Sequence, residues 1–263
     1  MKKIGTVSLL TILLIIGFHP DSFAEKKDEL LSCFCCHNDD DKDEHRENKR
    51  TRFKGHWAGI EFGFNNYLTP DNSFSLPVNM DYMTLHSGKS NNLNLNFYQI
   101  SAGITKHFGF VTGLSLNWNN YRFDGYNNIQ KIDSTGFIGM LDTGDEPLKK
   151  SKFGTLYLNM PLLLEIQIPA DHNRLHIAVG PIGGVKLFSY SSIVYKNKDK
   201  IKSGNDFNLN MLRYGFTARI GWENFHVYGT YYMTPLFKKD MGPEGPAGVD
   251  LYPFEIGFAF TIN

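Results

Sequence analysis

The chain has 263 residues and a formal net charge of zero at pH 7; 14% of its residues are aromatic and 3 are cysteine. A neutral chain lacks the excess of Lys and Arg by which proteins bind nucleic acid, so we expect no nucleic-acid partner. Because aromatic side chains are enriched in strands, the composition favours a β protein.

Residues 1–24 are predicted to be a cleaved secretory signal. Lys2 and Lys3 form a positive start, an apolar run extends from Ile4 to Phe18, and Ser22-Phe23-Ala24 offers small residues for cleavage. A transmembrane anchor is the alternative, but the run is short for a hydrocarbon layer of about 30 Å. The mature chain is therefore expected to begin near Glu25.

Residues 25–54 are predicted to be a flexible, charged leader that faces the periplasm, because they contain few apolar residues. The C-x-x-C spacing within this leader gives weak candidates for a metal site, namely Cys33, Cys36 and His37. A disulfide between two of the three cysteines is the alternative, because the periplasm is oxidising. We expect no metal and no other cofactor.

From His56 onward, apolar and polar residues alternate. In the first such segment Ile60, Phe62 and Phe64 share one face, while Glu61 and Asn65 share the other. Alternation of this kind predicts half-buried strands. Eight are expected, at 56–68, 93–106, 110–123, 153–168, 174–190, 209–222, 225–235 and 251–263. A slip of phase near Tyr98 predicts a β-bulge in the second of them.

Short and long connections between these strands alternate strictly. The tight ones lie around 107–109, 169–173 and 223–224, and the long polar ones at 69–92, 124–152, 191–206 and 236–250. Outer-membrane barrels have short periplasmic turns and longer external loops. Residues 55–263 are therefore predicted to form an all-β, eight-stranded antiparallel up-and-down transmembrane β-barrel in the cell outer membrane, with the N-terminus and C-terminus in the periplasm.

The polar rows of the strands are rich in small residues and carry few charges, which suits the interior of a narrow barrel. The apolar rows would then face lipid. The interior charges are predicted to form an ion network that largely plugs the lumen: Glu61, Glu165, Arg213, Arg219 and Glu255. Solvation of some of these charges in a wet lumen is the alternative.

Aromatic residues near the strand ends predict two membrane-interface belts. One belt is expected at the periplasmic ends, from Trp57, Phe108, Trp222 and Phe225. The other is expected towards the external ends, from Tyr67, Trp118, Tyr121, Phe123 and Tyr190.

The sequence predicts no enzyme and no catalytic residues. His86, Asp124 and Asp133 lie in or beside long loops, and no Ser–His or Asp–His pairing is legible around them. His176 and His226 fall on the inner face, where we expect satisfied interior residues.

Three segments carry a resemblance to a known family: 55–67 (GHWAGIEFGFNNY), 93–98 (LNLNFY) and 112–123 (TGLSLNWNNYRF). They resemble the small outer-membrane β-barrel proteins of Bacteroidota, the PorT-like group, and the resemblance covers about 55–263. It implies a barrel in the outer membrane. PorT itself is associated with assembly of the type IX secretion system, so the resemblance also implies an accessory role in protein secretion.

The expected function is therefore that of a non-enzymatic outer-membrane barrel with a structural, adhesive or accessory role. Its expected partners are outer-membrane lipid, the barrel-insertion machinery and other envelope proteins that contact loops 69–92 and 124–152. Two alternatives stay open: an accessory factor in protein secretion, and a soluble exported barrel that binds an apolar ligand.

Overall fold

The computed structural model describes residues 53–262, apart from 125–127, 133, 141–147, 171–172 and 197–199. The predicted signal and nearly all of the predicted leader lie outside the described residues, as do the metal candidates Cys33, Cys36 and His37. Within the described ranges, no helix is long and apolar enough to cross a membrane.

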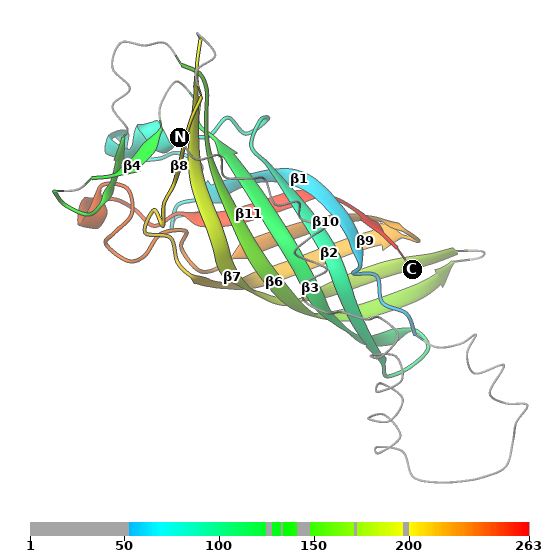
Figure 1. The fold of residues 1–263 in the computed structure, drawn as a ribbon. Coiled ribbons are helices and arrows are strands. Elements are labelled where there is room, and N and C mark those ends of the chain that lie inside the picture. Colours follow the sequence, from blue (N-terminus) through cyan, green and yellow to red (C-terminus); the bar gives the residue numbers. More distant parts are fainter. Residues whose placement is uncertain are drawn as a thin grey trace, which may run out of the picture. The chain divides into compact units, whose positions relative to one another are not determined.

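In the described part of the chain, eight antiparallel strands close into a ring (Figure 1). Each strand pairs with the next ring strand along the chain, and the last pairs with the first. The ring contains β1 (Gly59–Leu68), β2 (Asn91–Gly103), β3 (Phe108–Arg122), β6 (Leu148–Ala170), β7 (Asn173–Tyr195), β9 (Leu212–Trp222), β10 (Phe225–Tyr232) and β11 (Tyr252–Thr261). The predicted eight-stranded up-and-down barrel is confirmed.

The predicted bulge is also confirmed. The register between β2 and β3 shifts between Asn96 and Tyr98. Phe97 and Tyr98 are both exposed on the outer face, and Gln99 resumes the inward row. The extra residue lets two neighbouring aromatic side chains share one face of the strand, which a regular strand forbids.

The apolar rows point out of the barrel. Phe62 is 52% exposed, and large apolar side chains from every ring strand are exposed with it, whereas Glu61 is 2% exposed and Asn65 is buried. A soluble barrel would bury its apolar row, so the alternative of a soluble exported barrel with an apolar ligand inside is wrong. An apolar outer band and a polar interior are the arrangement that lipid favours.

The two ends of the barrel differ. At one, here called the turn end, short turns join β2 to β3, β6 to β7 and β9 to β10, and Gly59 of β1 pairs with Thr261 of β11. At the other, the loop end, the connections are long. There β6 and β7 continue as a paired ribbon, and β8 (Lys200–Gly204) adds to the end of β7.

The loop-end connections fold into a cap, which the sequence did not predict. They contain two 3-10 helices, η1 (Val78–Met83) and η2 (Gly245–Ala247), and a small hairpin of β4 (Ile129–Lys131) and β5 (Ile138–Met140). Their buried side chains form one apolar cluster with the loop ends of the strands: Tyr67, Met80, Tyr82, Met83, Leu85, Tyr121, Phe123, Ile129, Ile138, Phe153, Phe207, Leu209, Leu236, Phe237 and Leu251. We call this cluster and the segments that carry it the cap.

The cap corrects the prediction of an external aromatic belt. Tyr67, Tyr121, Phe123 and Tyr190 are buried at the loop end, and Trp57 is buried inside the turn end. Tyr67 continues the inward row of Asn65, and Tyr121 that of Asn119, so strand parity turns both inward. Trp118, Trp222 and Phe225 are exposed on the outside, where a belt residue belongs.

Candidate functional site

The barrel interior contains the most unusual chemistry in the described part of the chain, because charged groups are buried there. Glu61 accepts hydrogen bonds from Asn94 Nδ2 at 2.6 Å, Asn96 Nδ2 at 2.7 Å and Arg219 Nη2 at 2.5 Å. The guanidinium of Arg219 also lies 4.4 Å from the ring of Trp57. This carboxylate is therefore held by one full ion pair and two amides.

Glu255 is held differently. Its oxygens accept hydrogen bonds from Asn92, Asn117 and Asn119, at 3.0–3.1 Å. Among the described residues no arginine lies within ion-pair distance of it. Asn117 instead links Glu255 to the nearby cation of Arg213. Its Nδ2 donates to Glu255, and its Oδ1 accepts from Arg213 Nη2 at 2.6 Å.

Arg213 lies between two aromatic rings. Its guanidinium carbon is 3.7 Å from the ring centre of Tyr157 and 3.8 Å from that of Tyr232, and Nη2 also donates to Asn159 Oδ1 at 3.1 Å. A Cβ atom on Gly184 would lie 2.2 Å from that Asn159 oxygen, so a side chain at this position would displace the amide to which Arg213 donates. Cation–π contacts on both faces hold the charge in the middle of the lumen without a carboxylate beside it.

Glu165 lies near the turn end and has no arginine partner in the described ranges. It accepts from the backbone N–H of His56 at 2.9 Å, from Gln167 Nε2 at 2.9 Å, and contacts His56 Nδ1 at 2.6 Å. These contacts help to hold residues 53–58 against the turn end of the barrel. There Gln99 accepts from the N–H groups of Trp57 and Ala58. Phe53 and Lys54, the last residues of the predicted leader, thus belong to the folded unit.

The structure therefore places all five predicted interior charges inside the barrel but divides them into three groups. Glu61 pairs with Arg219, Arg213 reaches Glu255 through Asn117, and Glu165 binds His56. Hydrogen bonds between strands that are not neighbours cross the lumen throughout, for example from Arg213 on β9 to Asn117 on β3. Side chains thus fill the width of the barrel at its centre.

The expectation that His176 and His226 are satisfied interior residues is wrong for His226, whereas Nδ1 of His176 faces Glu165 Oε1 at 3.7 Å, longer than a hydrogen bond. Nδ1 of His176 and both ring nitrogens of His226 are buried without a hydrogen-bond partner. Both histidines pair through the sheet with Gly221, so they lie at the same height on β7 and β10. The sequence offered a signal for this: the two tight turns nearest to them fix the register of these strands.

The loop residues considered for catalysis belong to the cap. His86 N donates to Arg122 O at 2.8 Å and Asp124 N to Thr84 O at 2.7 Å, so both residues lie on one backbone bridge. Asp133 lies outside the described residues. The cap also has a groove of about 410 Å³, lined by residues of β4, the end of β7 and β8, among them Lys131, Tyr195 and Ile201.

Asp206 ties the cap to the barrel wall. It forms ion pairs with Lys186 of β7 and, at 3.0 Å, with Lys238 of the last cap loop. Hydrogen bonding to Lys186 lowers the pKa of the Asp206 carboxyl below its ordinary value of 3.8. Because the pKa of Asp206 is lowered in the folded state, its ion pairs stabilise the cap fully when the pH is above the ordinary pKa. This stabilisation is lost as the pH falls through the lowered pKa of the folded state.

Replacing Asp206 by Asn should therefore lower the free energy of unfolding at pH 7 by about 1 kcal/mol or less, because the carboxylate is half exposed and solvent screens it. Urea titrations at several pH values measure this. The difference between D206N and the wild type should shrink towards zero as the pH falls below 3.8. Asp250→Asn, which removes an exposed cap carboxylate, is the matched control. A difference that grows in acid would contradict the assignment.

Comparison with known families supplies the deciding observation. The model of the family described as outer membrane protein β-barrel domain matches residues 45–238, which is most of the chain. The chain belongs to this family. Membership in the outer membrane protein β-barrel domain family places it in the outer membrane and agrees with the apolar outer band and closed ring described above.

Among solved structures, the chain is similar to the crystal structure of Ail, the attachment invasion locus protein of Yersinia pestis. The identity is 9%, the TM-score is 0.31, and the similarity covers 78% of this chain and 99% of that chain. No curated protein matches the sequence.

Proposed function

We propose that this member of the outer-membrane β-barrel family is a non-enzymatic surface protein. Its barrel is closed, and its cap makes adhesive or structural contacts. The observation that carries the proposal is the cap itself. Loops that only joined strands would need no apolar core, whereas the described residues of the loop-end segments bury fifteen apolar and aromatic side chains together. A preorganised surface of this kind suits binding, because less conformational entropy is lost on contact.

The difference between the two ends supports an orientation in the membrane. Short turns face the periplasm in outer-membrane barrels and long connections face outward. The turn end would then lie in the periplasm with both ends of the barrel chain, and the cap would lie outside the cell. The groove beside β4 and the exposed β8 would meet other envelope proteins or surfaces, and lipid would surround the apolar band.

The test replaces the β4–β5 region, residues 128–147, by a short Gly-Ser linker and compares cells that produce this variant with cells that produce the wild type. A gel run before and after boiling first verifies that the variant still folds, because membrane barrels stay folded in SDS until heated. Loss of adherence to surfaces, with the secreted proteins unchanged, is the expected result. Unchanged adherence in folded variants of this loop and of loop 69–90 would contradict the proposal.

An accessory role in protein secretion is the second candidate. The resemblance of 55–67, 93–98 and 112–123 to PorT-like proteins of Bacteroidota favours it, and the filled lumen limits the role to an accessory one, because a folded or unfolded cargo needs an open path. In the same experiment this candidate expects the reverse pattern: secreted proteins disappear from the medium while adherence persists.

A closed lumen has a direct electrical consequence. The purified protein in planar bilayers should give no stable large conductance steps, because side chains bonded across the lumen leave no continuous water path. Current recordings at several voltages measure this, with a wide porin in the same bilayers as the control. Regular large steps from the folded protein would show that the plug opens.

A further inference from the structure

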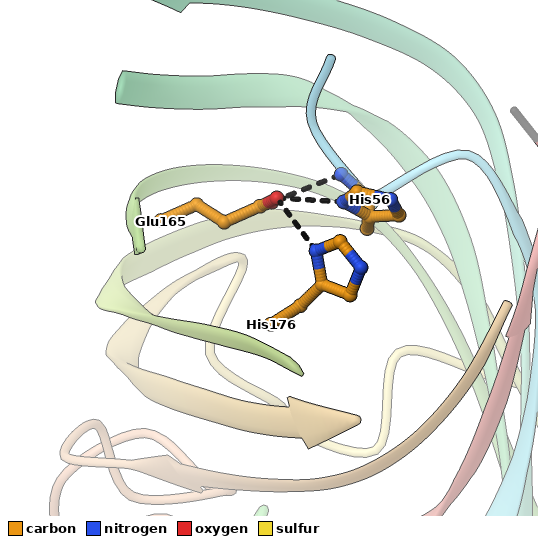
Figure 2. Close-up of side chains that lie close together, drawn as sticks. All are labelled: His56, Glu165 and His176. Carbon is orange, nitrogen blue, oxygen red and sulfur yellow. Dashed lines mark hydrogen bonds and ion pairs between the residues drawn. The ribbon is translucent and has the colours of Figure 1, made fainter. Parts of the chain in front are cut away.

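Three histidines and a glutamate meet inside the turn end. His56 precedes β1, Glu165 lies on β6, His176 on β7 and His226 on β10, so four separate segments contribute one side chain each. Figure 2 shows His56 and His176 directed at the same carboxylate oxygen of Glu165, at 2.6 Å and 3.7 Å. One ligand atom from each of His56, Glu165 and His176 lies within 4.8 Å of the others.

These distances suit a metal ion. Zn²⁺ binds His nitrogen and carboxylate oxygen at about 2.0–2.1 Å in a tetrahedral arrangement, so two of its ligands lie about 3.3 Å apart. The distance from Glu165 Oε1 to His56 Nδ1, 2.6 Å, is shorter than this separation, and the distance to His176 Nδ1, 3.7 Å, is longer. Small rotations of the rings would bring all three ligand atoms to one centre.

Buried nitrogens without partners are the second observation. Nδ1 of His176 and both ring nitrogens of His226 have no hydrogen-bond partner, and His226 is 1% exposed. A buried polar group without a partner is costly and rare in folded proteins. The ring of His226 lies 5.7 Å from the rings of both His56 and His176, close enough to supply a fourth ligand by turning about its side-chain bonds.

The surroundings also fit a cation. Gln167 donates to Glu165 Oε1 and accepts from Arg174, and the backbone N–H of His56 donates to Glu165 Oε2, so outer contacts orient the carboxylate. Arg219 is adjacent through its bond to the carbonyl oxygen of His56, but Glu61 already neutralises it. Glu165 therefore remains the charge that a divalent ion would meet.

We propose that His56, Glu165 and His176 bind one divalent transition-metal ion, for which Zn²⁺ is the best match, with His226 as the fourth ligand. Three imidazoles and a carboxylate select such ions over Mg²⁺ and Ca²⁺, which prefer oxygen alone. Because His56 precedes β1, the ion would hold the segment before β1 against β6, β7 and β10 and close the turn end. This goes beyond the proposed function, which concerns the cap at the opposite end.

The test titrates the full-length mature protein, folded in detergent and stripped of metal, with Zn²⁺ by calorimetry and with Co²⁺ by visible absorption. We expect one ion per chain and Co²⁺ bands typical of tetrahedral nitrogen and oxygen ligands. His176→Ala should weaken Zn²⁺ binding by about tenfold or more. Zn²⁺ should also raise the temperature at which the unboiled gel band converts to the unfolded one, in the wild type but not in H176A.

Two controls locate the ion. His107→Ala removes an exposed histidine at the same end of the barrel and should bind Zn²⁺ as the wild type does. The protein with Cys33, Cys35 and Cys36 all replaced by Ser should also keep the ion, because the proposed ligands include no thiolate. If H176A does not fold, His176→Gln and His226→Gln replace it as the test variants.

Several results would overturn the proposal. One is a wild type that takes up no Zn²⁺ or Co²⁺. Another is uptake that H107A loses as fully as H176A does, which would indicate adventitious binding. A third is binding that disappears in the cysteine-free protein and shows the near-ultraviolet absorption of thiolate ligands, which would place the ion on residues 33–37 instead.

Discussion

Replacing Arg213 by Met should lower the free energy of unfolding by about 3–5 kcal/mol, the usual loss when one member of a buried charged network is removed. Methionine fills much of the same space between Tyr157 and Tyr232, so the loss reports the charge and its hydrogen bonds. Without the guanidinium, Asn159 Oδ1 loses its donor, and Asn117 Oδ1 keeps only the hydrogen bond from Asn119 Nδ2. Urea unfolding in lipid vesicles, followed by tryptophan fluorescence, measures the change.

The matched control is Lys106→Met, which removes an exposed cation from the turn between β2 and β3. A surface change of this kind should alter the unfolding free energy by less than about 0.5 kcal/mol. If R213M loses no more than K106M, Arg213 must be solvated in a wet lumen, and the network across the barrel contributes little to stability.

Replacing Phe62 by Arg should lower the unfolding free energy by about 2–4 kcal/mol, the loss measured when a cation enters the middle of a bilayer on a barrel strand. Phe62 pairs with Phe258 on β11 and with Leu93 on β2, and its side chain is 52% exposed on the apolar band. In water the same change would be nearly neutral, because an exposed arginine is well solvated. The vesicle unfolding assay used for R213M measures this loss.

Val78→Arg controls for the substitution itself, since Val78 is 95% exposed at the start of η1 in the cap. It should unfold as the wild type does, to within about 0.5 kcal/mol. Equal effects at the two positions would mean that the band around Phe62 is not in contact with lipid, and the assignment of the outer face would fail.

The sequence predicted the barrel because lipid and lumen demand opposite side chains at successive positions of every strand. Apolar and polar residues therefore alternate with a period of two in each strand, as in Ile60, Glu61 and Phe62. The bulge could be predicted for the same reason, because the neighbouring aromatic residues Phe97 and Tyr98 break this period. The burial of Glu61, Glu165, Arg213, Arg219 and Glu255 followed from the same rule.

The partners of those charges could not be predicted in the same way. Which side chains meet across the lumen depends on the tilt and stagger of the strands. Neither quantity can be predicted from the sequence of a single strand. The sequence predicts Glu255 only as a member of an ion network, and in the structure its hydrogen bonds come from asparagines of β2 and β3. Asparagine is common in the inward-facing rows, so the sequence could not show which asparagines would donate to Glu255.

What the sequence by itself determined is the number of strands, their facing and the alternation of short and long connections, all of which are local and periodic. Only the tertiary structure decided the cap and the turn-end cluster. The apolar residues of the cap, such as Met80 and Ile138, follow no period because loops have none. Glu165 and His176 lie close together across the β6–β7 hairpin, whereas His56 and His226 lie far from them along the chain and meet them only in the closed ring.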